Sequence, residues 1–170
     1  VLNYKPNVMG ITWFVKNVMP LLRNQVPDAK LLVVGRHPTH HVLELGREDG
    51  VEIVGSVPDV RTYLEDASVA IAPLRIARGV QNKVLEAMAC GKAVVCSHGA
   101  ANGIDATDGE HFLRADQPTE WAEKLTQLLN DAPMRQRIGT AARQRVEESY
   151  SWESCMQPMI DLLQNAPQIA

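Results

Sequence analysis

Apolar residues recur along the chain with two different periods, one typical of buried strands and one typical of helices. Continuous apolar runs predict strands at Ala29–Gly35, Val51–Gly55, Ser68–Pro73 and Lys92–Ser97. Residues three and four apart form a first helical stripe, made of Val8, Ile11, Val15, Val18 and Leu22. Asn7 is its predicted N-cap, and Pro20 is expected to kink or restart the helix. Because strands alternate with helices, the pattern indicates an α/β fold with a mainly parallel sheet.

Three helices are predicted after a last short strand at Glu110–Ala115. Their expected starting points are Pro118, Met134 and Ser151. This helical tail should pack on one side of the sheet, with Trp121 and Trp152 as packing residues.

One stretch joins a buried strand, a basic loop and a helix, and the rest of the chain is arranged around it. The apolar run Val69–Ala72 leads into a loop that contains Arg75, Arg78 and Gly79. The next apolar residues share a helical face that should lie against the sheet: Val80, Val84, Ala87 and Met88. A different face carries Asn82, Lys83 and Glu86. Cys90-Gly91 is expected to end the helix with a left-handed cap.

The start of this helix offers a site for an anion. Free backbone N–H groups and the positive end of the helix dipole face whatever lies beyond the strand, next to Arg75, Arg78 and Lys83. Glu86 lies about two turns further along, where it would accept hydrogen bonds from vicinal hydroxyls. Phosphates at one end and a diol nearby suit a nucleotide sugar. The alternative is that the three cations are solvated and Glu86 only pairs with Lys83.

Composition and charge narrow the class of protein. The chain has 170 residues, of which 45% are hydrophobic and 22% charged, as in an ordinary globular domain. A net charge of −3 argues against nucleic acid as the main partner. No apolar run approaches the roughly 18 residues that a membrane helix needs. The three cysteines lack a C-x-x-C spacing, which favours free thiols in a reducing compartment and predicts a cytoplasmic protein.

Patterns for metals and common cofactors are missing from the sequence. There is no Asp-x-Asp pair to hold a divalent ion on a diphosphate, and no G-x-G-x-x-G follows any predicted strand. His37, His40 and His41 lie in a short polar segment without a fourth ligand, so solvated histidines are favoured over a metal site. His98 is expected to be a loop histidine without a role. We therefore expect neither a metal nor a cofactor.

The run Gly79-Val-Gln-Asn-Lys-Val-Leu-Glu-Ala-Met-Ala-Cys-Gly-Lys-Ala-Val-Val resembles the donor-binding segment of family 4 glycosyltransferases. The two preceding predicted strands match that family in the same order. Lys5-Pro-Asn and the stretch Arg75–Glu86 resemble more narrowly the sugar transferases associated with bacterial exosortase systems. The resemblance covers nearly the whole chain. It implies a Rossmann-like sheet with helices on both faces, the C-terminal half of the two-domain GT-B architecture.

The resemblance also implies a role for individual residues. The glutamate that matches Glu86 binds the ribose hydroxyls, Arg36 and Lys83 face the diphosphate, and the amides of Gly79, Val80 and Gln81 lie against the phosphate or the sugar. Arg75, Arg78 and Asn82 complete the predicted donor site. The family usually has a glutamate where this chain has Arg78, a position that touches the transferred sugar, so the identity of the sugar stays open.

The predicted activity is a retaining, metal-independent transfer of a sugar from a nucleoside-diphosphate sugar to a glycan or lipid-linked acceptor. The acceptor would bind through an N-terminal domain ahead of Val1, and the full-length bacterial enzyme would contact the membrane peripherally. We therefore expect residues 1–170 to be a donor-binding domain that is inactive alone. Two alternatives are a non-catalytic α/β interaction module and half of a sugar-nucleotide epimerase.

Overall fold

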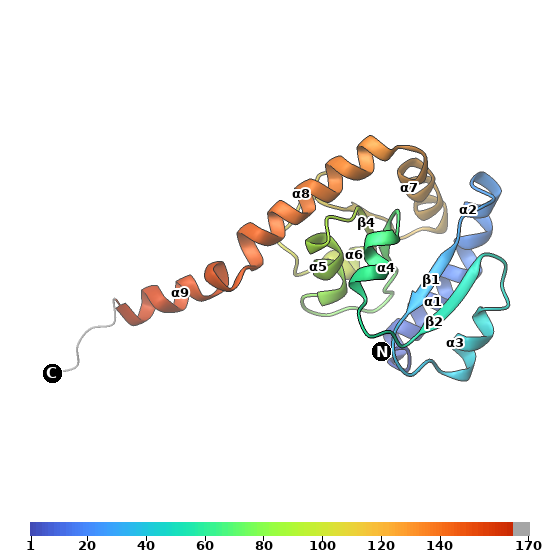
Figure 1. Ribbon diagram of the computed structural model, residues 1–170, viewed down its shortest axis with the longest axis horizontal. Coiled ribbons are helices and arrows are strands. Elements are labelled where there is room, and N and C mark those ends of the chain that lie inside the picture. The colour runs from blue at the N-terminus through green and yellow to red at the C-terminus, as the bar shows by residue number, and fades with distance from the viewer. Residues whose placement is uncertain (165–170) are drawn as a thin grey trace.

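The computed structural model describes residues 1–164, which form an α/β unit (Figure 1). The strands are β1 (Leu31–Val34), β2 (Val51–Gly55), β3 (Ala70–Ala72), β4 (Val94–Cys96) and β5 (Leu113–Arg114). The helices are α1 (Lys5–Asn17), α2 (Met19–Gln25), α3 (His40–Leu45), α4 (Arg61–Asp66), α5 (Asn82–Ala89), α6 (His98–Ala101), α7 (Pro118–Asn130), α8 (Ala132–Tyr150) and α9 (Trp152–Gln164). All of the predicted strands are present: β2 has the predicted bounds, and the other four are shorter than predicted.

All strand pairings within residues 1–164 are parallel, as the sequence predicts. β1 pairs with β2 from Leu31 opposite Val51, and the register shifts by one residue between Val33 and Val34. β3, β4 and β5 form a second ladder, in that order. In the described part of the chain, no hydrogen-bonded ladder joins β1 to β3, so the strands form two parallel sheets where one was expected.

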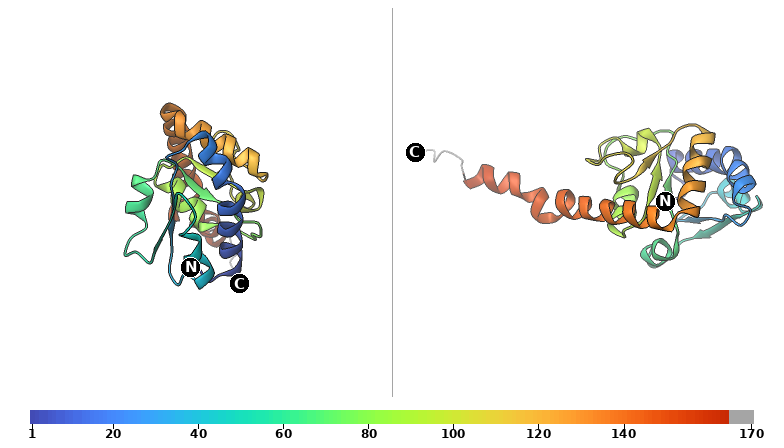
Figure 2. Two further views of the ribbon diagram at one scale, coloured as in Figure 1. Left: turned by 90° about the vertical axis from the view of Figure 1, so that its right-hand side faces the viewer. Right: turned by 90° about the horizontal axis from the view of Figure 1, so that it is seen from above.

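β4 shows that helices cover both faces of the larger sheet. Successive side chains of a strand point to opposite faces. Val95 belongs to a hydrophobic cluster with α1, α2 and α7, whereas Val94 and Cys96 belong to another with α5, α6 and α8. Each of the three side chains is at most 1% exposed. The predicted two-faced arrangement is therefore confirmed, and the two layers are visible in Figure 2.

The smaller sheet is covered on one face only, which corrects the prediction that β1 is buried throughout. Val33 packs in a small cluster with Leu2 and Val42, on the side of α1 and α3. Leu32 points the other way and keeps 43% of its surface exposed. An apolar run therefore marked the strand correctly but not its burial, because no helix of the described chain covers its second face.

The first predicted helix divides in two at Val18, close to Pro20 as expected. α1 ends at Asn17 and α2 begins at Met19, with Pro20 in its first turn. The predicted cap was wrong: the N-cap is Tyr4, so α1 begins three residues earlier than expected, and Asn7 lies in its first turn. The side chain of Tyr4 makes no capping hydrogen bond. Because Asn7 does not cap the helix, its side-chain amide is available for other contacts.

The helical tail behaves in two ways. α8 approaches the end of α5 so closely that a Cβ on Gly139 would lie 2.0 Å from the carbonyl oxygen of Gly91. α9 instead extends away from the rest of the molecule and has no buried residue (Figures 1 and 2). Trp121 in α7 is fully buried, as predicted, but Trp152 is 81% exposed, because α9 has no partner surface in the described chain. The prediction that the whole tail packs on the sheet was wrong for α9.

Candidate functional site

The loop from β3 to α5 carries most of the predicted site residues and is anchored at its start. A Cβ on Gly10 of α1 would lie 2.5 Å from the carbonyl oxygen of Pro73, so glycine allows the helix to approach the loop. The buried Ser97 donates a hydrogen bond of 2.6 Å from Oγ to the carbonyl oxygen of Leu74. The backbone beyond β3 is therefore held by α1 on one side and by the end of β4 on the other.

The two faces of α5 separate as the sequence predicts, with one correction. Val84, Ala87 and Met88 are at most 1% exposed and pack against β3 and β4. Val80 was predicted on the same buried stripe but is 46% exposed. It lies before the helix, in a segment where Gly79 has a positive φ of 65° and Gln81 is extended. The helical spacing does not continue through this turn.

The opposite face of α5 is open to solvent. Asn82, Lys83 and Glu86 are all exposed, and the side chain of Glu86 does not enter the packed core. At the other end of the helix, Gly91 adopts a φ of 66°, which confirms the predicted left-handed cap.

A cavity of about 290 Å³ lies between the start of α1 and the loop before α5. Its walls come from both segments: Tyr4, Pro6, Asn7, Leu74, Ile76, Ala77, Arg78, Gln81 and Lys83. Gln81 donates hydrogen bonds from Nε2 to the carbonyl oxygens of Arg78 (3.0 Å) and Gly79 (3.2 Å), and so holds the bend closed. The Arg78–Gly79 bend therefore borders an open cavity.

Lys83 connects the two walls of this cavity. Its Nζ donates a hydrogen bond of 3.0 Å to Oδ1 of Asn7, whose Nδ2 in turn donates to the carbonyl oxygen of Val1 at 2.7 Å. Lys83 is an exposed residue, but burial of its ammonium between the walls lowers its pKa, and the charge of Glu86 partly offsets this. A cation that has lost part of its hydration gains from a nearby anion more than a fully solvated one.

These contacts argue against one part of the alternative from the sequence, the pairing of Glu86 with Lys83, whereas its other part agrees with the structure, because Arg75, Arg78 and Lys83 are all exposed. No ion pair joins Lys83 to Glu86 in the described chain, because the ammonium is directed to Asn7. The carboxylate of Glu86 therefore remains available to another partner.

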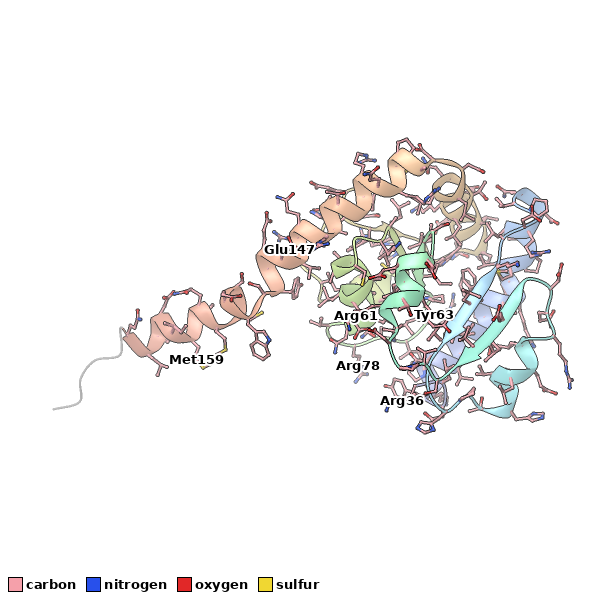
Figure 3. The ribbon with its side chains drawn as sticks, viewed as in Figure 1. Arg36, Arg61, Tyr63, Arg78, Glu147 and Met159 are labelled. Atoms are coloured by element: carbon pink, nitrogen blue, oxygen red, sulfur yellow. The ribbon has the colours of Figure 1, made fainter. Side chains whose placement is uncertain are left out.

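The structure brings together part of the predicted set. Arg78, Gln81 and Lys83 line the cavity, and four residues lie next to them in the chain on exposed positions: Gly79, Val80, Asn82 and Glu86. Arg36 is exposed just beyond β1, where its carbonyl oxygen accepts a hydrogen bond of 2.7 Å from the amide of Leu2 (Figure 3). It does not line this cavity. Arg75 lines a different one.

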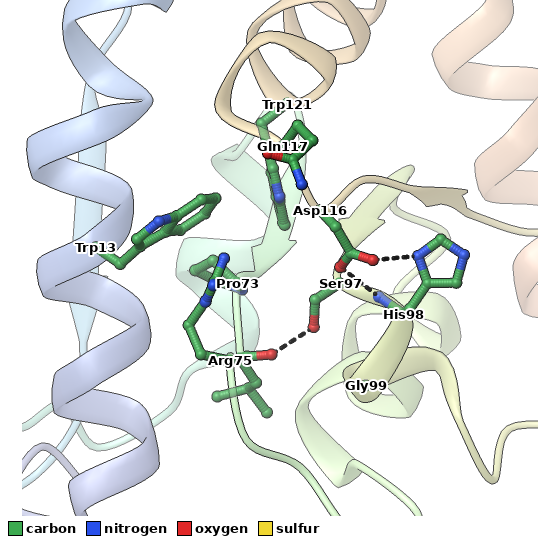
Figure 4. A pocket seen from close by; sticks show the side chains of 10 residues that line it. Trp13, Pro73, Arg75, Ser97, His98, Gly99, Asp116, Gln117 and Trp121 are labelled. Carbon is green, nitrogen blue, oxygen red and sulfur yellow. Dashed lines mark hydrogen bonds and ion pairs between the residues drawn. The ribbon is translucent and has the colours of Figure 1, made fainter.

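The second cavity, of about 350 Å³, lies where β3, β4 and β5 end (Figure 4). Its lining consists of Trp13, Pro73, Leu74, Arg75, Ser97, His98, Gly99, Asp116, Gln117 and Trp121. His98 begins α6, where Nδ1 lies 2.5 Å from Oδ2 of Asp116 and the backbone amide donates to Oδ1 at 3.1 Å. His98 thus has a structural partner that its place in the sequence did not reveal.

Sequence reasoning also missed the contribution of α1 to the first cavity. Tyr4 and Asn7 come from the stretch after Val1, about 75 residues before Lys83, and no spacing rule connects segments so far apart. The Lys5-Pro-Asn stretch was the one feature that could have indicated them.

Among residues 1–164 no three His, Cys, Asp or Glu side chains are placed to hold a metal ion. Nor is any helix there long and apolar enough to cross a membrane.

The sequence profile of the family described as glycosyl transferases group 1 matches residues 1–131. The chain belongs to this family. Among its relatives is a GDP-mannose-dependent monoacylated alpha-(1-6)-phosphatidylinositol monomannoside mannosyltransferase of Corynebacterium glutamicum. The two are 29% identical over an alignment of 163 positions, and the match covers 88% of this chain and 42% of the relative.

Two solved structures have the same fold as this group 1 chain. HepE of Anabaena in complex with UDP matches with a TM-score of 0.70 and 17% identity, over 87% of this chain and 45% of HepE. The C-terminal domain of the group 1 protein LpcC of Francisella tularensis matches with a TM-score of 0.69 and 19% identity, over 84% of this chain and 80% of that domain. The predicted Rossmann-like fold of GT-B glycosyltransferases is confirmed. The chain spans less than half the length of the mannosyltransferase and of HepE.

Proposed function

We propose that this group 1 chain binds the nucleoside-diphosphate sugar of a metal-independent glycosyltransferase. The observation that carries the proposal is the arrangement on one face of α5. There the ammonium of Lys83 borders a cavity, and the carboxylate of Glu86, three residues further along the helix, has no ion-pair partner in the described chain. A cation and a free carboxylate about one turn apart match a diphosphate next to a ribose.

The diphosphate would lie at the start of α5, against the amides of Gly79, Val80 and Gln81. Unpaired N–H groups and the helix dipole favour an anion there, and Arg78 and Lys83 add positive charge. Arg36 would approach from the end of β1. When the glycosidic bond breaks, negative charge grows on the leaving nucleoside diphosphate. Fixed donors stabilise this charge without the need for a divalent ion.

Glu86 would accept hydrogen bonds from the ribose hydroxyls. A carboxylate is an acceptor with two oxygens and can bind both hydroxyls of a vicinal diol. Arg78 would lie near the transferred sugar. Because a guanidinium is only a donor, it favours a sugar with acceptors or a negative charge at that side.

The second substrate would be a glycan or lipid-linked acceptor, held by a domain outside this chain. The Corynebacterium relative is named for a lipid-anchored acceptor, phosphatidylinositol monomannoside, and so supports an acceptor of this kind. The full-length enzyme would work in the cytoplasm with a peripheral contact to the membrane. The chain alone would bind the donor and transfer nothing.

The experiment that tests this function is calorimetric titration of the chain with UDP, GDP and ADP, with the free nucleosides as controls. One diphosphate should bind at millimolar concentration or below, its nucleoside should bind more weakly, and EDTA should leave the affinity unchanged. If all three diphosphates fail to bind, the donor site is wrong. Loss of binding with EDTA would contradict metal independence alone.

The structure does not favour the interaction-module alternative at this site. Such a module should lack a pocket between Arg75 and Glu86, whereas a cavity lies there. Leu2 is 4% exposed and Trp13 is half-buried, so neither forms an open apolar surface. The final helix, α9, does expose apolar side chains, with Trp152 81% and Leu162 74% exposed, and this is the observation that favours such a module.

A further inference from the structure

The second cavity contains a buried hydrogen-bond donor without an acceptor. Trp121 is fully buried, it lines the cavity, and its indole Nε1 has no hydrogen-bond partner among residues 1–164. Buried polar atoms are nearly always paired, so an unpaired one requires an explanation. Phe14 and Trp13 pack edge-on against the ring, with centroids 5.4 and 6.4 Å away, and fix its position.

Arg75 provides a second set of unused donors in the same cavity. Its Cζ lies 4.9 Å from the centroid of the Trp13 ring. This is the only cation–π contact in the described chain. No carboxylate pairs with it there, although a guanidinium has five N–H donors in a rigid fork. Trp13 touches both Arg75 and Trp121, so the two donors lie around one aromatic ring (Figure 4).

Two side chains of the cavity that offer acceptors, Asp116 and Ser97, already have partners. Both oxygens of Asp116 interact with His98, one with its ring and one with its backbone amide. The hydroxyl of Ser97 donates to Leu74 and accepts from the amide of Ala100 at 3.1 Å. The groups left without a partner are therefore donors. One of them, Arg75, carries a positive charge, and the one negative charge among the lining residues, on Asp116, is hydrogen-bonded to His98. Such a cavity matches a ligand that offers hydrogen-bond acceptors and carries a negative charge.

We propose that this cavity is a second ligand site, separate from the donor site, which binds the oxyanion of a small acidic sugar. Arg75 would bind the phosphate or carboxylate, and Trp121 would donate its indole N–H to an oxygen of the same ligand. A volume of about 350 Å³ exceeds what a bare oxyanion fills and leaves room for a sugar ring. The ligand is thus a sugar phosphate or a uronic acid.

The proposal can be tested by NMR, because the chain has three indole N–H groups, on Trp13, Trp121 and Trp152. Single Trp→Phe variants assign the three signals. Glucose 1-phosphate and glucuronate are then titrated separately, with glucose as the neutral control. The Trp121 signal should move downfield with at least one of the two anions and not with glucose, while the exposed Trp152 stays in place. The anion that binds more tightly identifies the oxyanion.

Two variants measure the contribution of each donor. Arg75→Gln should weaken anion binding about tenfold or more, since a hydrogen bond to a charged group is lost. Trp121→Phe keeps an aromatic ring but removes the N–H together with the five-membered ring of the indole, so it should weaken binding by roughly fivefold or more. Its urea midpoint measures separately what the smaller side chain costs in stability. Arg137→Gln is the matched control. It removes one positive charge from an exposed position on α8 and should leave the affinity unchanged.

Several outcomes would overturn the proposal. These are an unmoved Trp121 signal at tens of millimolar anion, an equal response to glucose, and an equal loss in the Arg75 and Arg137 variants. Displacement of the anion by saturating UDP would place the cavity inside the nucleotide site and would also overturn it. Failure here leaves the donor site intact, because UDP binding and its dependence on Glu86 are measured separately.

Discussion

The two faces of α5 show how one short helix serves two purposes. The face with Val84, Ala87 and Met88 is buried against β3 and β4 and fixes the position of the helix. The face with Lys83 and Glu86 has no partner in the core and borders the cavity at the start of α1. Substitutions on the packed face should therefore lower the free energy of unfolding and leave the groups that bind the ligand unchanged. Substitutions on the open face should weaken ligand binding and leave the free energy of unfolding unchanged.

The largest expected effect is on the packed face. Met88→Ala should lower the free energy of unfolding by about 2–5 kcal/mol, because it leaves a cavity in a side chain position that is fully buried. Urea unfolding followed by circular dichroism measures the change. Glu86→Ala, two residues away on the open face, is the control and should stay within about 0.5 kcal/mol of the parent chain. Equal losses for the two variants would contradict the separation of the faces.

Cys96 lies in the same buried cluster and predicts a pH dependence of stability. Burial raises the pKa of its thiol to about 12. In the unfolded chain the thiol ionises at its ordinary pKa, so the unfolded state is favoured increasingly above that pH. The stabilising contribution is complete below about pH 9 and is lost as the pH rises toward 12, by roughly 1 kcal/mol per pH unit. Cys96→Ala should show a flatter pH profile in urea unfolding. An identical profile would show that the thiol does not resist ionisation.

On the open face, Lys83→Gln should weaken nucleoside diphosphate binding about tenfold and leave the urea midpoint unchanged. The ammonium of the parent chain should titrate below the ordinary pKa of lysine, because it is partly desolvated. A bound diphosphate should raise that pKa again, since negative charge favours the protonated amine. NMR of the Lys83 side chain with and without nucleotide measures both shifts. A pKa that does not respond to the nucleotide would place the diphosphate elsewhere.

The buried half of α5 could be predicted from the sequence because burial imposes a helical period. The same rule failed at Val80, where Gly79 turns the chain before the helix begins. The polar face was also predictable, because residues that fall outside the apolar stripe of a helix are expected to face solvent. What could not be predicted is the wall supplied by Tyr4 and Asn7, because such a contact depends on tertiary structure. The unpaired indole of Trp121 was hidden for the same reason.

α9 gives the smallest expected effect and marks a further limit of sequence patterns. Its apolar spacing suggested a packed helix, yet Trp152 is 81% exposed. Trp152→Ala should therefore change the free energy of unfolding of this chain by no more than about 0.5 kcal/mol. Thermal and urea unfolding measure the change. A loss of about 3 kcal/mol or more, typical of a buried tryptophan, would show that α9 packs on the chain.

The measurement that tests the central claim most directly is the affinity for a nucleoside diphosphate and for its 2′,3′-dideoxy analogue, in the parent chain and in Glu86→Ala. If Glu86 binds the ribose hydroxyls, the parent chain should prefer the ribonucleotide about tenfold or more, and the variant should bind both equally. A preference that survives in Glu86→Ala would contradict the account, because some other group would then recognise the ribose.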